Sequence, residues 1–346
     1  MFSSILGNED VKDNLIRLKV SGRVPNAMLF AGPEGVGKRL FALELARLLL
    51  CSTPEGNEAC EACSACTRVG RFEIPAPTDK NRDDFRKVFF GRHGDVGMIV
   101  AHRRVIAVDA IRDLEKEVYF RPFESAARVF IIDDADKMND PAANALLKTL
   151  EEPAAASHVI LVTSRPDSLV PTIRSRSQAF RFATVATEQI TRFLMDSRGL
   201  GEPEARLAAK LSGGSVGRAV TLDIERLKSR RFELTEVLRN GLVEHDRVAL
   251  LRAAEQLSEA KNKDNFEDDL ELLLTLVRDT WAVKLGETES GLLHADLFDE
   301  LNEAARHAGS AKLESLISEI GLIRERLVVN LNKKLAADDL FMKLAA

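Results

Sequence analysis

The amino-acid sequence predicts an α/β domain built on a parallel sheet and followed by two all-helical domains. Up to about residue 183, short apolar runs of strand length alternate with stretches of helical periodicity. This alternation is typical of a parallel sheet with helices on both faces. A glycine-rich turn follows the first of these strands, and strand signals stop beyond residue 183. We therefore predict domains at 1–183, 184–227 and 228–346.

The composition is that of an ordinary globular protein of 346 residues, 45% apolar and 30% charged, which is long enough for two or three domains. The net charge of −5 argues against nucleic-acid binding by the whole surface. No apolar run approaches the roughly 18–20 residues of a membrane span, and the first residues do not resemble a signal peptide. We expect a cytoplasmic protein with no membrane partner.

The elements of the first domain follow from caps, breakers and periodicity. Asn8 is expected to cap the first helix. Pro25 precedes the first strand, Pro141 suits a first helical position, and Pro153 ends that helix. Residues 70–95 carry prolines and mixed charges and are expected to form an irregular insertion. The predicted strands are 27–31, 105–108, 128–132 and 159–163, and the predicted helices are 8–22, 38–50, 109–118 and 141–152.

The rest of the chain is expected to be helical. Two or three short helices, separated by glycines, are predicted in 186–222. Loops are expected near 261–265, 286–291 and 308–310 of the last domain. The last long helix is predicted to carry an apolar stripe made of Leu316, Ile320, Ile323, Leu327 and Leu331.

The turn after the first strand has the spacing G-x-x-x-x-G-K of a phosphate-binding loop, met by Gly32, Gly37 and Lys38. Glycines let backbone N–H groups converge on an anion at a helix N-terminus. The next residue of such loops is Ser or Thr, whose hydroxyl holds Mg²⁺, and here it is Arg39. ATP or ADP is therefore the candidate ligand, whereas Arg39 puts Mg²⁺ in doubt. The candidate binding residues are Gly32, Pro33, Glu34, Gly35, Val36, Gly37, Lys38 and Arg39.

A second nucleotide element is predicted where an apolar strand ends in Asp133 and Asp134. A carboxylate at that sheet edge can hold Mg²⁺ directly or through water. The following position usually supplies a Glu that orients the attacking water, and Asp134 is one methylene shorter. The alternative is a pair of carboxylates that cap the next helix.

Four cysteines lie close together in the sequence. Eight residues separate Cys51 from Cys60, and two residues separate each of the next pairs, up to Cys63 and Cys66. In a cytoplasmic chain this spacing favours a metal over disulfides, and four thiolates form a closed, structural Zn²⁺ site. Buried reduced cysteines and an iron–sulfur cluster are the alternatives.

Two further candidates follow the strand at 159–163. Ser164 lies at its end, where a hydroxyl could sense a γ-phosphate. Arg176 lies in the basic segment Ile173-Arg174-Ser175-Arg176, and a guanidinium there suits phosphate recognition in its own or a neighbouring subunit. The alternative is a solvated arginine in a surface loop.

In this order, these motifs resemble the AAA+ clamp-loader family over nearly the whole chain. The resemblance rests on segments that include the phosphate loop and the cysteine cluster. The others are Phe130-Ile131-Ile132-Asp133-Asp134-Ala135-Asp136-Lys137-Met138, Asn144-Ala145-Leu146-Leu147-Lys148-Thr149-Leu150-Glu151-Glu152-Pro153, Ile173-Arg174-Ser175-Arg176, Gly214-Ser215-Val216-Gly217-Arg218-Ala219 and Asn330-Leu331-Asn332-Lys333-Lys334-Leu335.

The resemblance implies an ATPase-type domain at 1–183 with a zinc module at 51–66, a helical lid at 184–227 and an oligomerising collar at 228–346. It implies a pentameric ring with gamma/tau motor subunits and a delta subunit, which places the sliding clamp on primed DNA. In the family's Ser-Arg-Cys motif, matched by Ser175 and Arg176, the arginine reaches the ATP of the adjacent subunit.

Departures from the family's motor subunits indicate which role this chain has. Arg39 replaces Ser or Thr, Asp134 replaces Glu, and Gly214–Arg218 replaces the lid pattern Gly-Ser-x-Arg-Asp. The long C-terminal extension that tau subunits carry is also not expected in this chain. A stator with weak or no ATPase is therefore predicted. The alternatives are an ATP-hydrolysing motor in which Asp134 orients the water, and an unrelated zinc-bearing nucleic-acid binder.

Overall fold

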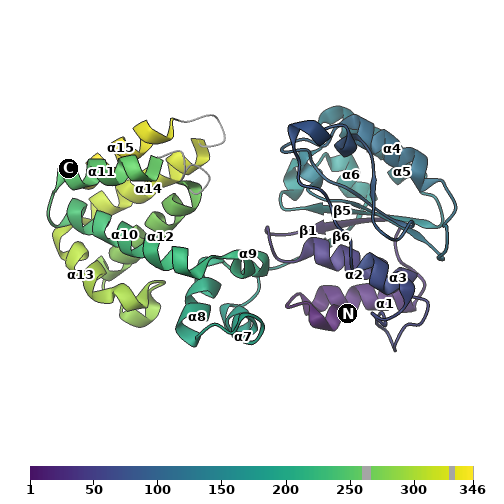
Figure 1. Cartoon of the computed structure of the whole chain (residues 1–346), viewed down its shortest axis with the longest axis horizontal. Coiled ribbons are helices and arrows are strands. Elements are labelled where there is room, and N and C mark those ends of the chain that lie inside the picture. The colour runs from purple at the N-terminus through teal and green to yellow at the C-terminus, as the bar shows by residue number, and fades with distance from the viewer. Residues whose placement is uncertain (259–265, 327–331, 346) are drawn as a thin grey trace. The chain divides into compact units, whose positions relative to one another are not determined.

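The computed structural model describes residues 1–258, 266–326 and 332–345 of the chain. The chain divides into two compact units, residues 1–221 and residues 222–346 (Figure 1). The predicted order of an α/β domain followed by helical regions is confirmed. Among the described residues, no helix is long and apolar enough to cross a membrane.

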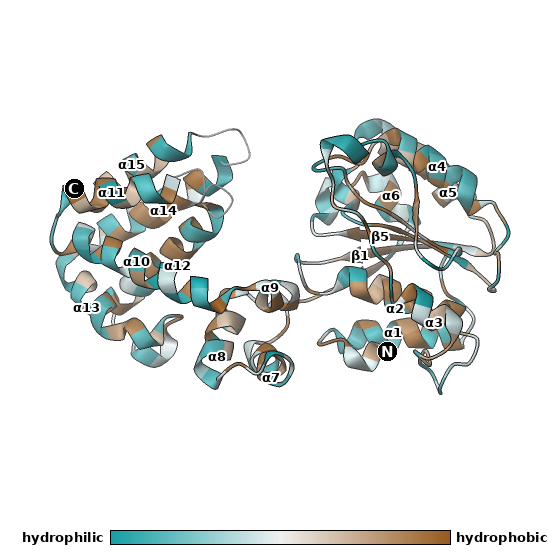
Figure 2. Cartoon of the chain, in the orientation of Figure 1, coloured by the Kyte–Doolittle hydropathy of each residue, from teal (hydrophilic) through white to brown (hydrophobic). Residues whose placement is uncertain are grey.

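The first unit contains a six-stranded sheet with the strand order β2-β3-β4-β5-β1-β6. All neighbouring strands are parallel except β2 and β3, which are antiparallel. The central strands are buried along their whole length and are brown, or hydrophobic, in Figure 2. The strands are β1 (Ala27–Ala31), β2 (Phe89–Phe90), β3 (Val96–Ile99), β4 (Arg128–Ile132), β5 (Ser157–Thr163) and β6 (Gln178–Arg181).

Helices cover both faces of this sheet, as predicted (Figure 1). One apolar core lies between the sheet and α1 (Glu9–Val20), α2 (Lys38–Leu50) and α3 (Ser64–Val69). The other lies against α4 (Val108–Val118), α5 (Asp140–Glu151) and α6 (Pro171–Arg176). Three further helices complete the unit: α7 (Thr187–Arg198), α8 (Glu202–Leu211) and α9 (Val216–Thr221).

The predicted strand at 105–108 is wrong. Val105 and Ile106 form isolated bridges only, and α4 already begins at Val108. The strand in this place is β3, which contains Gly97, a weak strand former. The glycine is needed because a Cβ there would lie 2.5 Å from Val88 Cγ1.

Asn8 is the N-cap residue of α1, as predicted, but its side chain has another role. Asn8 has a left-handed backbone (φ 55°) and its side chain does not cap its own helix. Its amide donates to the Ala183 carbonyl at 3.2 Å and accepts from the Ala183 N–H at 2.7 Å. Asn8 therefore fastens the segment that follows the sheet. Within the insertion, residues 70–95 are mostly irregular, as predicted, and contain two short 3₁₀ turns and β2.

The second unit is helical throughout its described residues. The predicted loops near 286–291 and 308–310 are confirmed between helices, whereas residues 261–265, Leu327 and Leu331 lie outside the described residues. The helices are α10 (Ile224–Leu242), α11 (Arg247–Ser258), α12 (Phe266–Lys284), α13 (Phe298–His307), α14 (Ser310–Arg326) and α15 (Lys333–Ala345).

Candidate nucleotide site and cysteine cluster

The phosphate loop connects β1 to α2, as the sequence predicts. Gly35 and Gly37 have φ values of 72° and 96°, a left-handed conformation that side chains rarely adopt. Gly37 is the N-cap residue of α2. The loop therefore has the backbone shape of an anion cradle at a helix N-terminus.

Lys38 is turned into the loop. Its side-chain nitrogen donates to the carbonyl oxygens of Gly32 at 2.7 Å and Pro33 at 2.5 Å. Lys38 is only 6% exposed, and burial lowers the pKa of its amine, while Asp133 and Glu34 act in the opposite direction. Lys38 is therefore a buried cation held by the carbonyl oxygens of its own loop.

Arg39 contacts the carboxylate that the sequence assigned to Mg²⁺. Its Nη1 lies 3.2 Å from Asp133 Oδ2. The Asp133 side chain is 16% exposed and that of Arg39 is 56% exposed. Burial raises the pKa of Asp133, and the charge of Arg39 opposes this rise. The structure thus brings the loop and the end of β4 together through a protein cation.

The second acid of the pair is engaged locally. Asp134 has a left-handed backbone (φ 52°), and its carboxylate accepts from Lys137 at 2.7 Å. It also precedes a short 3₁₀ turn, Ala135–Lys137. This surface ion pair gives the carboxylate a partner other than an attacking water.

Asp136 was not predicted as a site residue, but it organises the end of β5. Its carboxylate accepts from the Thr163 hydroxyl at 2.7 Å and from two nitrogens of Arg165 at 3.0 and 2.8 Å. These contacts hold both neighbours of Ser164, the predicted sensor, which follows β5. The sequence shows the acidic residues after β4, but it does not show that the end of β5 lies beside them.

The first turn of α9 and Ser215, the residue before it, lie against the phosphate loop. The Gly217 N–H donates to the Gly35 carbonyl at 2.8 Å, and a Cβ on Gly35 would lie 2.0 Å from Ser215 Oγ. Ser215 Oγ in turn accepts from the Arg218 N–H at 3.2 Å. The predicted lid motif therefore lies directly against the cradle.

Arg176 lies at the amino ends of the parallel strands, whereas the phosphate loop lies at their carboxyl ends. The loop follows the carboxyl end of β1, whereas Arg176 precedes β6, whose first residue pairs with Met28 near the amino end of β1. A strand of this length spans roughly 13–17 Å. Arg176 ends α6 and forms an ion pair with Glu151 at 2.7 Å, with the two side chains 37% and 50% exposed. The structure does not bring Arg176 to its own cradle.

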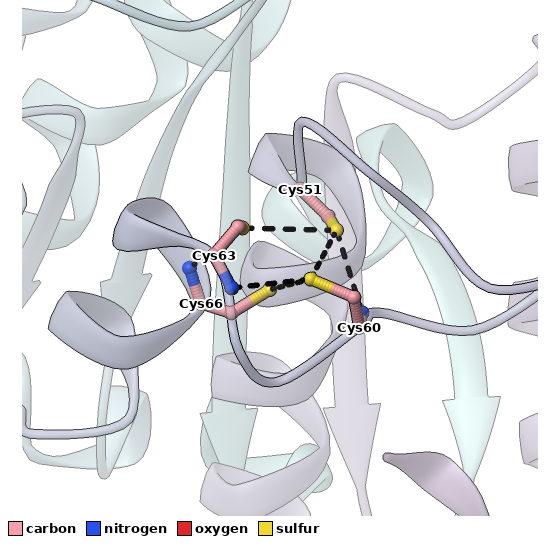
Figure 3. Close-up of side chains that lie close together, drawn as sticks. All are labelled: Cys51, Cys60, Cys63 and Cys66. Atoms are coloured by element: carbon pink, nitrogen blue, oxygen red, sulfur yellow. Dashed lines mark hydrogen bonds between the residues drawn. The ribbon is translucent and has the colours of Figure 1, made fainter.

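The four cysteines come together after α2 (Figure 3). Their sulfurs all lie within 4.8 Å of one another, and the Cys51–Cys60, Cys51–Cys63 and Cys60–Cys66 pairs are 3.6, 4.0 and 3.9 Å apart. Tetrahedral zinc with Zn–S bonds of about 2.3 Å requires sulfurs about 3.8 Å apart. The cluster formed by Cys51, Cys60, Cys63 and Cys66 therefore fits a four-coordinate metal ion.

Backbone groups support thiolates in this cluster. The N–H groups of Cys60, Cys63 and Cys66 donate to the sulfurs of Cys51, Cys60 and Cys63 at 3.3–3.4 Å. Burial raises the pKa of Cys63, but hydrogen bonds from the backbone of Cys66 and Ser52 outweigh it and lower the pKa to about 5. A low pKa favours the anionic ligand that a metal needs, whereas burial raises the pKa of Cys51 and of Cys66.

The cysteine module is fastened to the sheet by an ionic contact that the sequence did not reveal. Arg68 of α3 makes two hydrogen bonds of 2.7 Å with Glu124. The Asp95 carboxylate accepts from the backbone N–H groups of Phe123, Glu124 and Ser125. This loop before β4 thus joins the module to the sheet edge.

The chain matches the models of known protein families over most of its length. The profile of the family described as "DNA polymerase III, delta subunit" matches residues 7–186, and that of its C-terminal part matches residues 226–345. The chain belongs to the DNA polymerase III delta-subunit family. The clamp-loader relationship predicted from the motifs is confirmed.

Individual relatives agree with this family assignment. The chain is 26% identical to the DNA polymerase III subunit delta' of Escherichia coli, with 96% of this chain and 92% of that protein covered. It is 28% identical to the delta' subunit of Bacillus subtilis, with coverages of 90% and 88%. The tau subunit of Escherichia coli is 29% identical over 331 residues, which are 92% of this chain but 47% of tau.

Proposed function

We propose that the protein is the delta-prime subunit of the DNA polymerase III clamp loader. In this role it is a stator: it supplies Arg176 in trans to the ATP of a neighbouring motor subunit and has weak or no ATPase of its own. The delta' subunits of Escherichia coli and Bacillus subtilis, which this chain matches over most of their length, support the assignment as a delta-prime subunit. The observation that carries the stator role is Arg176, exposed at the sheet edge away from its own cradle.

The ion pair of Arg176 is suited to release. Both Arg176 and Glu151 are more than a third exposed, and such surface pairs contribute only about 0–1 kcal/mol. A phosphate on an adjacent subunit would therefore compete easily for the guanidinium. An arginine supplied in trans in this way contributes a large rate factor in phosphoryl transfer.

The low ATPase is inferred from the hydrolysis motifs. Arg39 offers no oxygen to Mg²⁺, and Asp134, in place of Glu, is paired with Lys137. Metal-assisted hydrolysis needs both a bridging cation and an oriented water. Both functions are altered in this chain.

The remaining parts of the proposal follow from the family. The partners are the gamma/tau motor subunits and the delta subunit in a heteropentameric ring, and through them the sliding clamp and primed DNA. Residues 184–227 act as a lid and 228–346 as the collar. The cysteine cluster holds a structural Zn²⁺, since four protein thiolates leave no position for a reacting water.

Reconstitution with motor and delta subunits tests the stator role. We compare wild type with Arg176→Ala and with Arg174→Ala, a matched control on the same helix that pairs with Asp167. We expect normal assembly by size-exclusion chromatography for all three. With clamp and primed DNA, Arg176→Ala should slow ATP turnover at the adjacent site by on the order of a thousandfold. Unchanged stimulation in Arg176→Ala would exclude the trans role.

A motor subunit is the second candidate, favoured by the match to tau. Purified protein that hydrolyses ATP rapidly by itself, with the activity abolished in Lys38→Ala, would support the motor and exclude the stator. We expect no such activity above the level of Lys38→Ala.

A further inference from the structure

The position that holds Mg²⁺ in phosphate-loop proteins is chemically unsuited to it in this chain. Mg²⁺ takes oxygen ligands in near-octahedral geometry, and the loop position that offers a hydroxyl oxygen is Arg39, which has only nitrogen donors. The second ligand position, Asp133, is already contacted by Arg39 Nη1 at 3.2 Å. A divalent cation here would meet a positive charge instead of a ligand.

The charge of Arg39 can take over part of the role that Mg²⁺ has in such loops. A guanidinium is permanently charged and carries five N–H donors in a planar fork. The contact with Asp133 Oδ2 uses Nη1, and the Arg39 side chain is 56% exposed. It can therefore neutralise the buried carboxylate and present other donors to an anion on its open side.

The rest of the cradle keeps the features that bind phosphate. The left-handed Gly35 and Gly37 shape the turn, and α2, a helix of 13 residues, begins at Lys38. Lys38 is buried in the turn on two carbonyl oxygens of the same loop. Backbone N–H groups, one buried amine and one guanidinium thus converge where the metal-bound phosphates of a nucleotide would otherwise lie.

We propose that this site binds the phosphates of a nucleoside di- or triphosphate without a divalent cation, with the Arg39 guanidinium bridging phosphate and Asp133 in place of Mg²⁺. Binding and hydrolysis are thereby separated: the anion is held by fixed protein charges, while the metal that activates phosphoryl transfer is excluded. This inference goes beyond the stator role and does not depend on Arg176.

Nucleotide binding by the purified full chain tests the inference. Dissociation constants for ADP and ATP are measured by titration calorimetry in buffer with excess Mg²⁺ and in buffer with EDTA. For wild type we expect binding in EDTA to be as tight as in Mg²⁺, within about twofold, or tighter. In Arg39→Thr, which restores a hydroxyl ligand, binding should become about tenfold or more tighter with Mg²⁺ than with EDTA.

Two controls make the result interpretable. Lys38→Ala should lose binding under both conditions, which ties the signal to the cradle, and circular dichroism melts identify any variant that fails to fold. Wild-type binding that tightens tenfold or more with Mg²⁺ would overturn the inference. So would failure of folded wild type to bind ADP and ATP in either buffer. Neither result bears on Arg176, which the reconstituted ATPase tests separately.

Discussion

Arg128 offers a sharp test of how the sheet is held together around β3 and β4. It begins β4 and is 0% exposed. Its Nη2 lies 3.0 Å from Glu117 Oε2 and its Nε lies 3.8 Å from Asp95 Oδ1. The guanidinium carbon also lies 5.1–5.5 Å from the ring centres of Phe90, Phe123 and Phe130. Replacing Arg128 by Met keeps the length of the side chain and removes the charge.

The expected loss follows from the buried carboxylate left behind. Breaking a buried ion pair by removing one partner costs about 3–5 kcal/mol. Asp95 keeps three backbone N–H donors, so we place Arg128→Met at the lower end, about 3 kcal/mol of unfolding free energy. For a unit of 150–250 residues this corresponds to a fall in Tm of about 6–12 °C.

Hydrogen exchange of the full chain measures this loss locally, through the amides of β3 and β4. The fluorescence of Trp281, the single tryptophan, reports the second unit and should not change. Arg68→Gln is the matched control, because it removes an exposed pair with Glu124 and should cost only about 0–1 kcal/mol. Combining Arg128→Met with Asp95→Asn should cost less than the two single losses added. A loss below about 1 kcal/mol in Arg128→Met would refute the reasoning.

Three other predictions concern separate parts of the first unit. Cys63→Ser should reduce bound zinc, measured by elemental analysis, and lower the Tm; an unchanged metal content would count against the four-thiolate site. Gly35→Ala should cost about 1–3 kcal/mol more than Gly56→Ala in chemical unfolding, because both glycines are left-handed but only Gly35 meets Ser215. Burial lowers the pKa of His158, so its neutral form is favoured on folding. Stability should therefore fall as the pH drops below about 6.5, and less so in His158→Gln; equal pH profiles would argue against this.

Local patterns in the sequence were sufficient for much of the fold and for the cysteine site. The fully buried strands β1, β4 and β5 each contain a continuous apolar run of four or five residues, and a short spacing between cysteines leaves few geometries other than a cluster. By contrast, Gly97 interrupts the apolar run of β3. A glycine is needed at this position because the Val88 side chain approaches it closely. In β6 only Phe180 is buried, so apolar periodicity could not reveal it.

Contacts between segments that are distant in the chain could not be predicted from the sequence. The sequence shows that Arg39 replaces a hydroxyl, but not that its guanidinium reaches Asp133, 94 residues away. Likewise, the acid at Asp136 is evident, whereas its partners Thr163 and Arg165 depend on β4 and β5 being neighbours. Such pairings are set by sheet order, which local propensity does not encode.

The candidate phosphate-binding groups of the first unit lie at opposite ends of the parallel strands. At the carboxyl edge, Lys38 and Arg39 form a cradle with fixed positive charges and a ligand set that does not suit Mg²⁺. At the amino edge, Arg176 is held by a weak surface pair. Because the strands between them span roughly 13–17 Å, neither group can act on a phosphate bound by the other within one chain. A nucleotide held in the cradle without Mg²⁺, as we propose, would therefore persist unhydrolysed. In the proposed stator role, Arg176, which lies away from this cradle, serves the nucleotide of a second subunit.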